Sequence, residues 1–394
     1  MLQSILSTVW ILLQAVFAVM LLFPVFSYFV FLFKRTTLPY LEEPSQQNDY
    51  GLIVTAYKNS SNLDYVIGSL LKMQHHNFII YVVADNCPDY ECQFNDSRVI
   101  IIKPPVPLGN QLKSHFLAIQ HFKRPHHLLT IIDSDNIVHP GYLAALDPFF
   151  NAGYEAVQGV RTAKNLDTHY ACIDAVNELY YLFYDRKILF NIGSSCMLSG
   201  SGMAFTVSLY RECLEKLNNN GAGFDKVLQY QITKRGYRIA FAEEAIVYDE
   251  KTAHSDQLVK QRARWNNTWF RYFKFGFSLM GLGIKKADIN TLLFGFVLTR
   301  PPLFLLLFIC SLILIANIFI NTTAALYWLV FIGMFMCGFF LALFNSKTDK
   351  RIYHSLVHIP KFMFLQFLSL FKAKKANEFS VATEHRFNKD IDSM

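Results

Sequence analysis

The sequence predicts a membrane-anchored α/β protein, in which a mostly parallel sheet flanked by helices is joined to transmembrane and interfacial α-helices. Three observations support this prediction. The chain of 394 residues is 53% hydrophobic and only 17% charged, which is too apolar for an ordinary soluble domain. Two long stretches carry no charge. The region between them alternates strand-like apolar runs with helix-like amphipathic segments.

The first uncharged stretch covers residues 1–33, which contain no Asp, Glu, Lys or Arg. A membrane span needs about 20 apolar residues, so this stretch is long enough to cross a bilayer with some tilt. A cleaved signal peptide would have a basic start, a shorter apolar core and a small-residue cleavage site, and none of these is evident. We therefore expect a retained anchor.

The second uncharged stretch covers residues 301–345 and is about twice as long as one span. Asn321-Thr322-Thr323 interrupts it, which predicts helices near 302–320 and 324–344 joined by a tight turn. A buried hairpin in a soluble core is the alternative, but a core of this size does not need helices that are apolar on every face. Arg300 immediately precedes this stretch.

The segment from Ser355 to Phe371 is also strongly apolar, but it holds His358, Pro360 and Lys361 and is short for a span. We favour an interfacial helix on the cytoplasmic face over a further span.

Basic residues next to the three expected spans set the orientation, because cytoplasmic loops are enriched in Lys and Arg. With three spans, all these clusters fall on one side, which indicates the cytoplasmic side of the cell (inner) membrane. The clusters are Lys34 and Arg35, then Lys285 and Lys286, then Lys347, Lys350 and Arg351. The net charge of +7 fits contact with anionic lipid, and no basic run with interleaved aromatics supports nucleic acid.

We therefore expect five regions along the chain. They are an N-terminal transmembrane anchor at 1–35, a cytosolic domain at 40–270, an interfacial segment at 271–300, a transmembrane hairpin at 301–345, and a cytosolic interfacial helix with a basic tail at 346–394. The seven cysteines are scattered without a Cys-x-x-Cys pair, which favours free thiols in a reducing compartment over a zinc site.

The cytosolic region has a β-α-β-α rhythm, which is typical of a parallel sheet covered on both faces. The expected strands are 52–54, 78–83, 99–102 and 128–132, and the expected helices are 62–73, with Asn62 as its cap, and 111–122. Ligands of such sheets bind beyond the carboxyl ends of the strands. Polar residues stand at those ends, so we expect a nucleotide site there.

Asp133-Ser134-Asp135 follows the last of these strands. In extended backbone, residues i and i+2 point the same way. Two carboxylates so placed can share Mg²⁺ or Mn²⁺ with the oxygens of a diphosphate. A polar turn that caps the next helix is an equally good interpretation of the pair alone.

Three further features favour the metal interpretation. Asp85 ends the preceding strand, where its carboxylate could accept from a base imide or a ribose hydroxyl. Asp225 opens a helix near the small-residue loop Leu198–Met203, and is either a helix cap or a general base. In a helix, Gln261, Arg264 and Trp265 share one face. That face offers an amide, a guanidinium that can bind phosphate through two hydrogen bonds, and an aromatic ring on which a sugar can stack. Trp265 could instead be an interfacial anchor.

In this order, the motifs resemble the inverting family 2 glycosyltransferases of the GT-A fold, and most closely the membrane-integrated branch with cellulose, chitin and hyaluronan synthases. The resemblance spans roughly residues 50 to 345. Gln-x-x-Arg-Trp is a specific motif, whereas Asp-x-Asp alone is weak. The sequence departs from the family pattern at Gly223-Phe224 before the expected base, and at Ala84-Asp85-Asn86.

The resemblance implies a role for each motif residue. Asp85, Asp133, Gln261 and Arg264 would bind the nucleotide sugar, with Lys113 as a looser match near phosphate. Asp133 and Asp135 would hold Mg²⁺ or Mn²⁺, Asp225 would be the catalytic base, and Trp265 would form the floor of the acceptor site. If Asp225 is only a cap, one of Glu243, Glu244, Asp249 and Glu250 could replace it as base.

The expected activity is inverting transfer of a sugar from a nucleotide-sugar donor, expected to be a UDP-sugar, to a glycan acceptor in polysaccharide synthesis. Transfer of one sugar to a lipid or lipid-linked acceptor is the alternative, because three spans in one chain are few for a polymer channel, unless a homo-oligomer completes it. A non-catalytic membrane scaffold is a third interpretation. A secondary transporter would show more spans and polar residues at mid-membrane.

Overall fold

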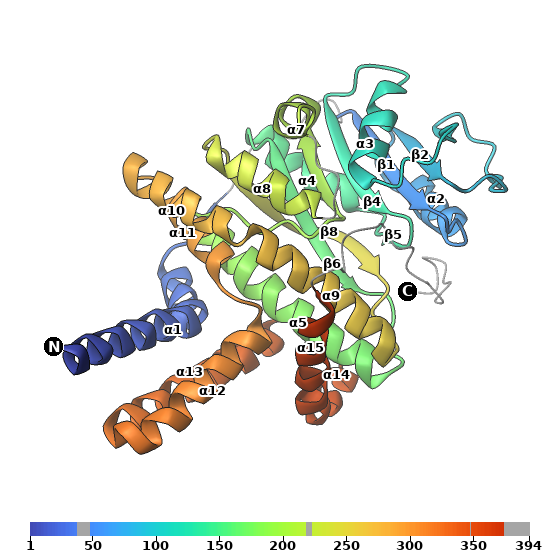
Figure 1. Ribbon diagram of the computed structural model, residues 1–394. Coiled ribbons are helices and arrows are strands. Elements are labelled where there is room, and N and C mark those ends of the chain that lie inside the picture. The colour runs from blue at the N-terminus through green and yellow to red at the C-terminus, as the bar shows by residue number, and fades with distance from the viewer. Residues whose placement is uncertain (38–47, 218–222, 347, 374–394) are drawn as a thin grey trace.

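The structure is a computed structural model that describes residues 1–37, 48–217, 223–346 and 348–373 (Figure 1). An α/β domain forms one end of the molecule, and long apolar helices project from it. The basic tail expected in residues 374–394 lies outside the described part of the chain. The boundaries expected for the five regions stay a prediction.

The α/β domain is built on one eight-stranded sheet with the order β3-β2-β1-β4-β7-β6-β8-β5. The strands are β1 (Tyr50–Tyr57), β2 (Phe78–Asp85), β3 (Val99–Ile102), β4 (Leu128–Asp133), β5 (Ile137–Val138), β6 (Ala156–Ala163), β7 (Met203–Thr206) and β8 (Ile239–Asp249). β1 to β4 are parallel to one another, as predicted. The sheet as a whole is mixed, because β7 runs antiparallel to β4 and β6, and β5 runs antiparallel to β8.

Helices cover both faces of this sheet (Figure 1). They are α2 (Leu63–Leu71), α3 (Gln111–Gln120), α4 (Tyr142–Asn151), α5 (His169–Tyr181), the π-helix η1 (Leu182–Ile188), α6 (Leu189–Asn191), α7 (Val207–Leu214), α8 (Phe224–Lys234) and α9 (Ser255–Tyr272). Because both faces are covered, β1, β2 and β4 are buried along almost their whole length. Strands in this position read as continuous apolar runs, which is why the sequence revealed them.

One local expectation is wrong. Asn62 precedes α2 as expected, but its side chain makes no capping hydrogen bond. Its backbone is already helical, with φ −103° and ψ −3°, whereas a capping residue is typically extended. The Asn62 side chain is instead buried.

A tight helical hairpin follows α9 and consists of α10 (Lys274–Lys286) and α11 (Ile289–Thr299). Glycines let the two backbones touch: a Cβ on Gly283 would lie 2.5 Å from the Leu292 backbone nitrogen, and one on Gly276 would lie 2.5 Å from the Gly295 carbonyl oxygen. Ile284 and Ile289 at the hairpin tip are exposed beside Lys285 and Lys286. This composition is consistent with the expected interfacial segment.

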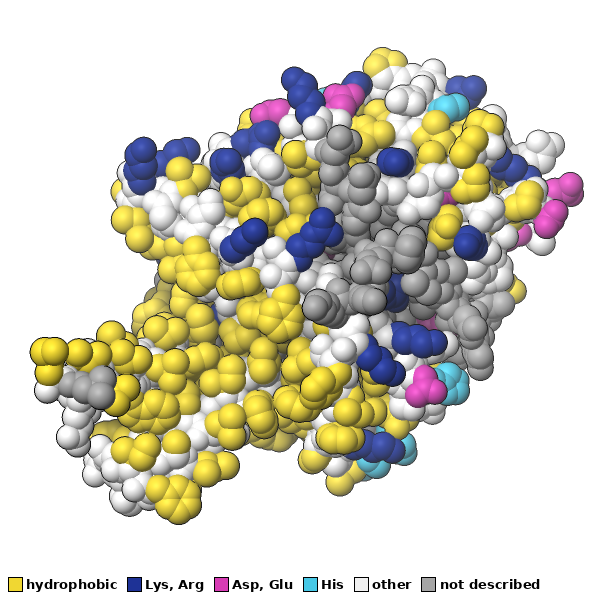
Figure 2. Space-filling view, viewed as in Figure 1, with side chains coloured by type: hydrophobic (Ala, Val, Ile, Leu, Met, Phe, Trp, Pro, Cys, Tyr) yellow, Lys and Arg dark blue, Asp and Glu magenta, His cyan; other side chains and the backbone are white. Residues whose placement is uncertain are grey.

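Three apolar helices are long enough to cross a membrane and pack together: α1 (Leu2–Phe33), α12 (Leu303–Ile320) and α13 (Thr322–Asn345). Asn321 separates the last two and accepts a hydrogen bond from the Ala324 N–H, so the predicted break is confirmed. The Gln14 side-chain oxygen accepts from Asn317 at 2.7 Å and from Trp328 at 2.8 Å, which joins all three helices. Figure 2 shows apolar side chains gathered over this end of the molecule.

A fourth segment, Lys350–Ala373, also has the length and composition of a span. It comprises α14 (Lys350–Ser355), a 3₁₀ turn (Leu356–His358) and α15 (Ile359–Ala373). The sequence favoured an interfacial helix here, and the four candidate spans exceed the three that we counted. α15 packs along α9, where the Asn266 amide donates to the Ser369 hydroxyl at 2.8 Å.

The close approach of α10 and α11 predicts that Gly283→Ala destabilises the protein, because the new methyl group would overlap the α11 backbone. We expect a loss of about 1–3 kcal/mol in thermal unfolding of the detergent-solubilised protein. Gly281→Ala is the matched control in the same helix, since its Cβ would meet nothing within 4 Å, and alanine raises helix propensity by about 1 kcal/mol. Equal effects of the two substitutions would contradict this packing.

Candidate active site

A cavity of about 1440 Å³ opens beyond the carboxyl ends of β1, β2 and β4, and extends between α8 and α9. All of the predicted site residues line it except Lys113. These lining residues are Asp85, Asp133, Asp135, Asp225, Gln261, Arg264 and Trp265. Lys113 lies in the first turn of α3 with an exposed side chain, so its expected approach to phosphate has no support in this geometry.

Asp85 is 1% exposed at the end of β2 and anchors a loop. Its two carboxylate oxygens accept from the backbone N–H groups of Leu108, at 2.9 Å, and Gly109, at 2.8 Å. Gly109 adopts φ +56°, a left-handed conformation that glycine reaches without strain. The carboxylate therefore shapes the rim of the cavity, and any contact with a nucleotide would add to this structural role.

The Asp133-Ser134-Asp135 segment is a turn, so the expected extended geometry is wrong. β4 ends at Asp133, and the Asn136 N–H donates to the Asp133 carbonyl oxygen at 3.1 Å, which closes a β-turn. Gln111 donates to the Asp133 carboxylate at 3.0 Å, and the Lys164 ammonium donates to the Asp135 carbonyl oxygen at 3.1 Å. The turn still directs both aspartates to the cavity.

The small-residue loop Leu198–Met203 lies between this turn and α8, and buried side chains hold it in place. The Gln158 amide donates to the carbonyl oxygens of Ser201 and Gly202 and accepts from the Ser199 N–H. The Ser201 hydroxyl accepts from the Asp133 N–H at 3.0 Å and donates to Asn136. The loop and the aspartate turn therefore form one connected unit.

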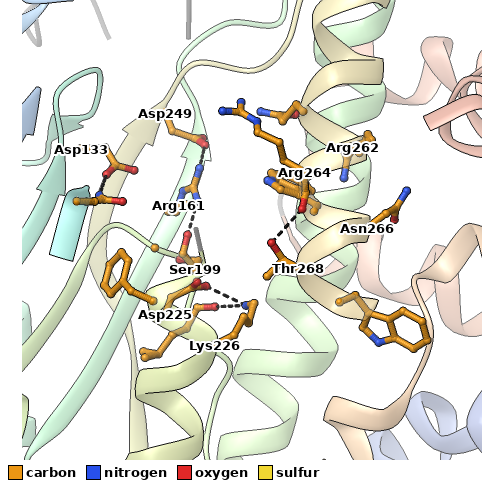
Figure 3. A pocket seen from close by; sticks show the side chains of 18 of the residues that line it. Asp133, Arg161, Ser199, Asp225, Lys226, Asp249, Arg262, Arg264, Asn266 and Thr268 are labelled. Carbon is orange, nitrogen blue, oxygen red and sulfur yellow. Dashed lines mark hydrogen bonds and ion pairs between the residues drawn. The ribbon is translucent and has the colours of Figure 1, made fainter. Parts of the chain in front are cut away.

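Asp225 stands in the first turn of α8 and is half-buried. Its carboxylate lies 3.0 Å from the Lys226 ammonium, which also donates to the Leu198 carbonyl oxygen at 3.1 Å (Figure 3). Gly223 precedes the helix with φ +89°, and a Cβ there would lie 2.8 Å from Thr268 on α9. Glycine at this position thus lets α8 begin directly against α9, which brings Asp225 toward the Arg264 helix.

Gln261, Arg264 and Trp265 lie within helix α9 and line the cavity, together with the residues between them. The Gln261 side-chain oxygen accepts from the Thr252 hydroxyl at 3.1 Å. Burial lowers the pKa of the Arg264 guanidinium from its ordinary value, so an anion in the cavity would relieve the cost of desolvating this cation. The Trp265 ring is 41% exposed and carries the Arg262 guanidinium 4.3 Å from its centre.

Buried acid–arginine pairs in the cavity wall escaped sequence reasoning. Arg161 on β6 pairs with Asp249 on β8 and donates to the Ser199 carbonyl oxygen at 2.6 Å, whereas Arg262 on α9 pairs with Asp174 on α5. Arg161 in a mostly apolar strand was the one local signal, because Arg262 lies in a helix with several other charged residues. Their partners lie about 88 residues away, a separation that no local pattern reveals.

One of these ion pairs affects whether Asp249, an alternative to Asp225, could act as the catalytic base. Asp249 is deeply buried, and although burial by itself would raise its pKa, Arg161 and Lys251 lower it. A carboxylate held ionised in this way is a weak proton acceptor. Glu243 and Glu244 are exposed and do not line the cavity, whereas Glu250 does. Asp225 therefore stays the expected base, with Glu250 as the alternative that also lines the cavity.

The residues present fit a divalent ion that is shared with a substrate. Asp133 and Asp135 supply hard carboxylate oxygens from one turn, and Mg²⁺ typically takes one or two carboxylates together with substrate phosphates and water. Within the described residues there is no group of three or more His, Cys, Asp or Glu side chains that could hold a metal by itself. The donor set therefore suits a metal–diphosphate complex better than a permanent protein-only site.

Solved structures with a similar fold include a mannosyltransferase, PcManGT from Pyrobaculum calidifontis, in complex with GDP-Man and Mn²⁺. It superposes with a TM-score of 0.54 at 14% sequence identity, over 94% of this chain and 99% of that chain. S. aureus TarS residues 1–349 match with a TM-score of 0.38 at 12% identity, over 83% of this chain and 90% of that chain. At these identities the first match supports a common GT-A-like fold. A comparison with curated protein sequences gave no match.

The family comparison covers the α/β domain. The model of the family described as "Glycosyltransferase like family 2" matches residues 47–268, which is more than half of the chain. The match includes both aspartates of the turn, Asp225 and the Gln261–Trp265 motif. The likeness to the cellulose, chitin and hyaluronan synthase branch stays a prediction. With its fold and its sequence in agreement, the chain belongs to the glycosyltransferase like family 2 and carries a transferase domain of that family.

Proposed function

We propose that the protein transfers a sugar from a nucleoside-diphosphate sugar to an acceptor at the membrane surface, with a divalent cation and with inversion at the anomeric carbon. One observation supports this most directly. The aspartate turn, Asp225 and the Gln261–Trp265 face of α9 come from distant parts of the chain and line one cavity. UDP is the expected nucleotide, and the GDP-Man bound to PcManGT makes a GDP-sugar the other donor to test.

The chain's own residues divide into two groups around the reacting centre. Arg264 and Gln261 on α9 would bind the diphosphate through charge-assisted and neutral hydrogen bonds. Asp225, on the facing helix, would take the proton from an acceptor hydroxyl as that oxygen attacks the anomeric carbon. Such general-base help typically contributes 10²–10⁴-fold. Lys226 would hold the Asp225 carboxylate in place before the acceptor binds.

Asp133 and Asp135 would hold the Mg²⁺ or Mn²⁺ ion, with Gln111 orienting the first carboxylate and Lys164 holding the backbone of the second. When bound, the ion would neutralise the negative charge on the departing nucleoside diphosphate. The Mn²⁺ in the PcManGT complex supports a divalent metal in a protein of the same fold.

Two acceptor classes remain from the sequence, a growing glycan and a lipid-linked acceptor. The cavity favours the second, because it reaches Pro301, Pro302 and Leu303, where α12 begins. An acceptor held there would stay next to the membrane. The length of the product on a sizing gel distinguishes the two classes: a polymer ladder indicates polysaccharide synthesis, and a single added sugar indicates lipid-linked transfer. Hydrolysis of a nucleotide sugar in the absence of acceptor tests the third interpretation, because a non-catalytic scaffold would not catalyse it.

Asp225→Asn should abolish most of the transfer while leaving donor binding nearly intact, because the amide keeps the shape but cannot accept a proton. We expect kcat to fall by about 10²–10⁴-fold in a radiolabelled-sugar transfer assay, with the donor Kd measured by calorimetry. Asp96→Asn is the matched control, since Asp96 pairs with Arg98 outside the cavity. Equal losses of donor binding and turnover would show that Asp225 is structural.

Gly223→Ala tests whether the contact between α8 and α9 positions Asp225. The Cβ would lie 2.8 Å from Thr268, so α8 must shift, and we expect kcat to fall about tenfold to a hundredfold. Gly236→Ala is the matched control at the other end of α8, since it has the same left-handed strain, with φ +90°, but meets nothing within 4 Å. Both variants should lose about 1 kcal/mol of stability or more from the backbone alone. Equal turnover in the two would contradict the positioning role.

Removal of divalent cations should stop transfer, and added Mg²⁺ or Mn²⁺ should restore it. Asp133→Asn and Asp135→Asn should each raise the metal concentration needed for half-maximal rate, because each removes one charged ligand. The measurement is a metal titration of the transfer rate after treatment with a chelator. Turnover that is unaffected by the chelator would exclude a metal role for both aspartates.

A further inference from the structure

One arm of the cavity leads to the membrane helices and has an apolar wall. Val297, Leu298, Pro302 and Leu303 line this membrane arm, with Tyr181 and Arg300 as its polar members. Leu303 is the first residue of α12, a candidate span. The whole cavity, at about 1440 Å³, exceeds the roughly 300–1,000 Å³ of a typical single-ligand pocket, so there is room for a second ligand beside the donor.

Arg300 is the unusual residue of this arm. It is only 8% exposed, and its Nη2 group donates to both carboxylate oxygens of Asp185 at 2.8 Å. Its Nε and Nη1 groups are buried and have no hydrogen-bond partner among the residues that the structure describes. A buried donor without a partner is costly, and two unsatisfied donors on a residue that lines a cavity indicate a ligand with acceptor oxygens.

The surroundings hold Arg300 rigidly. Its carbonyl oxygen accepts from the Trp269 indole on α9 at 2.8 Å, and Asp185 lies on the π-helix η1. Three residues further on, the Leu303 N–H donates to the Tyr181 hydroxyl at 3.1 Å, which fixes the start of α12. Charge-assisted hydrogen bonds are strongest when their donors are preorganised in this way.

The combination of charge and apolar wall defines the ligand. Asp185 already balances the charge of Arg300, so the ligand must supply acceptor oxygens for the two remaining donors, Nε and Nη1, and the oxygens of one phosphate group match this pair. Free phosphate would leave Val297, Leu298 and Leu303 without a partner. A lipid whose headgroup is a phosphate or diphosphate suits both features, because its hydrocarbon chain can follow the apolar wall to α12 and into the bilayer.

We infer that the membrane arm is the binding site for the phosphate group of a lipid-linked acceptor, with Arg300 as the residue that recognises it. The inference rests on the proposed function for its second half: a sugar attached to this phosphate would extend toward Asp225 in the same cavity. The site introduces no further covalent step. Arg300 binds the acceptor, and the transfer chemistry stays with the residues at the strand ends.

The test measures lipid binding to the full chain in nanodiscs by native mass spectrometry, with a polyprenyl phosphate and with the uncharged polyprenol of the same length. We expect the phosphate form to bind about tenfold to hundredfold more tightly, the range of charge-assisted hydrogen bonds. Competition with inorganic phosphate separates a lipid from a free-phosphate site, and phosphatidate shows whether any anionic lipid suffices. Equal binding of phosphate and alcohol, or full displacement by inorganic phosphate, would overturn the inference.

The variant that tests Arg300 must not leave Asp185 buried and unpaired. Arg300→Gln combined with Asp185→Asn replaces the ion pair by an amide pair, and monodisperse elution checks that it is folded. We expect this double variant to lose the preference for phosphate over alcohol. Arg351→Gln should keep it, because Arg351 is an exposed arginine beside the same membrane helices and outside the cavity. An unchanged preference in the folded double variant would exclude Arg300 as the recognition residue.

Donor binding separates failure of this inference from failure of the proposed function. Wild-type protein that binds neither UDP- nor GDP-sugars with Mn²⁺, but still prefers the lipid phosphate, would contradict the proposed function and leave the lipid site standing. Protein that binds and transfers from a nucleotide sugar without any phosphate preference would contradict the lipid site alone.

Discussion

Buried pairs between arginines and carboxylates hold the walls of the cavity together. Three of the four pairs join elements that are distant in the chain, and Arg186–Glu178 joins the consecutive helices α5 and η1. The four pairs are Arg161–Asp249 between β6 and β8, Arg262–Asp174 between α9 and α5, Arg186–Glu178 between η1 and α5, and Arg300–Asp185 between the start of the membrane hairpin and η1. Removing one partner of a buried pair typically costs about 3–5 kcal/mol, so these elements are constrained to one arrangement. The ion pairs therefore fix the positions of the strands and helices that line the cavity relative to one another.

This constraint explains how one cavity can separate two kinds of ligand. The strand-end side carries Asp133 and Asp135 on a turn that Gln111 and Ser201 hold, which is suited to a cation and a diphosphate. The α9 side carries Arg264, which is suited to the phosphates themselves. Because side chains of opposite charge face each other across a space, a phosphate-rich substrate with its cation can satisfy both walls at once.

α9 connects this chemistry to the membrane. Trp269 on α9 donates to the Arg300 carbonyl oxygen at the entry to the hairpin, and Asn266 donates to Ser369 on α15. Gly223 brings α8 against the same helix. Movement of the membrane helices would therefore be transmitted to Gln261 and Arg264 through hydrogen bonds and direct packing. A membrane-bound acceptor would thus lie next to the helix that we propose binds the donor.

The sequence by itself determined the elements and the chemical class. The apolar runs 78–83, 99–102 and 128–132 became β2, β3 and β4. β2 and β4 are buried almost throughout, and strands buried on both faces are apolar along their whole length. The break at Asn321 and the helical spacing of Gln261, Arg264 and Trp265 were also local patterns. Local periodicity is set by backbone geometry, so it can be read without coordinates.

Only the tertiary structure decided how these elements meet. It replaced the extended Asp133–Asp135 segment by a turn, gave Asp85 a loop to anchor, and left Lys113 outside the cavity. It also paired Arg161 and Arg262 with carboxylates far along the chain. These outcomes depend on which buried donors and acceptors find partners across the fold, and the energy of such pairing depends on distances in space that no sequence spacing contains.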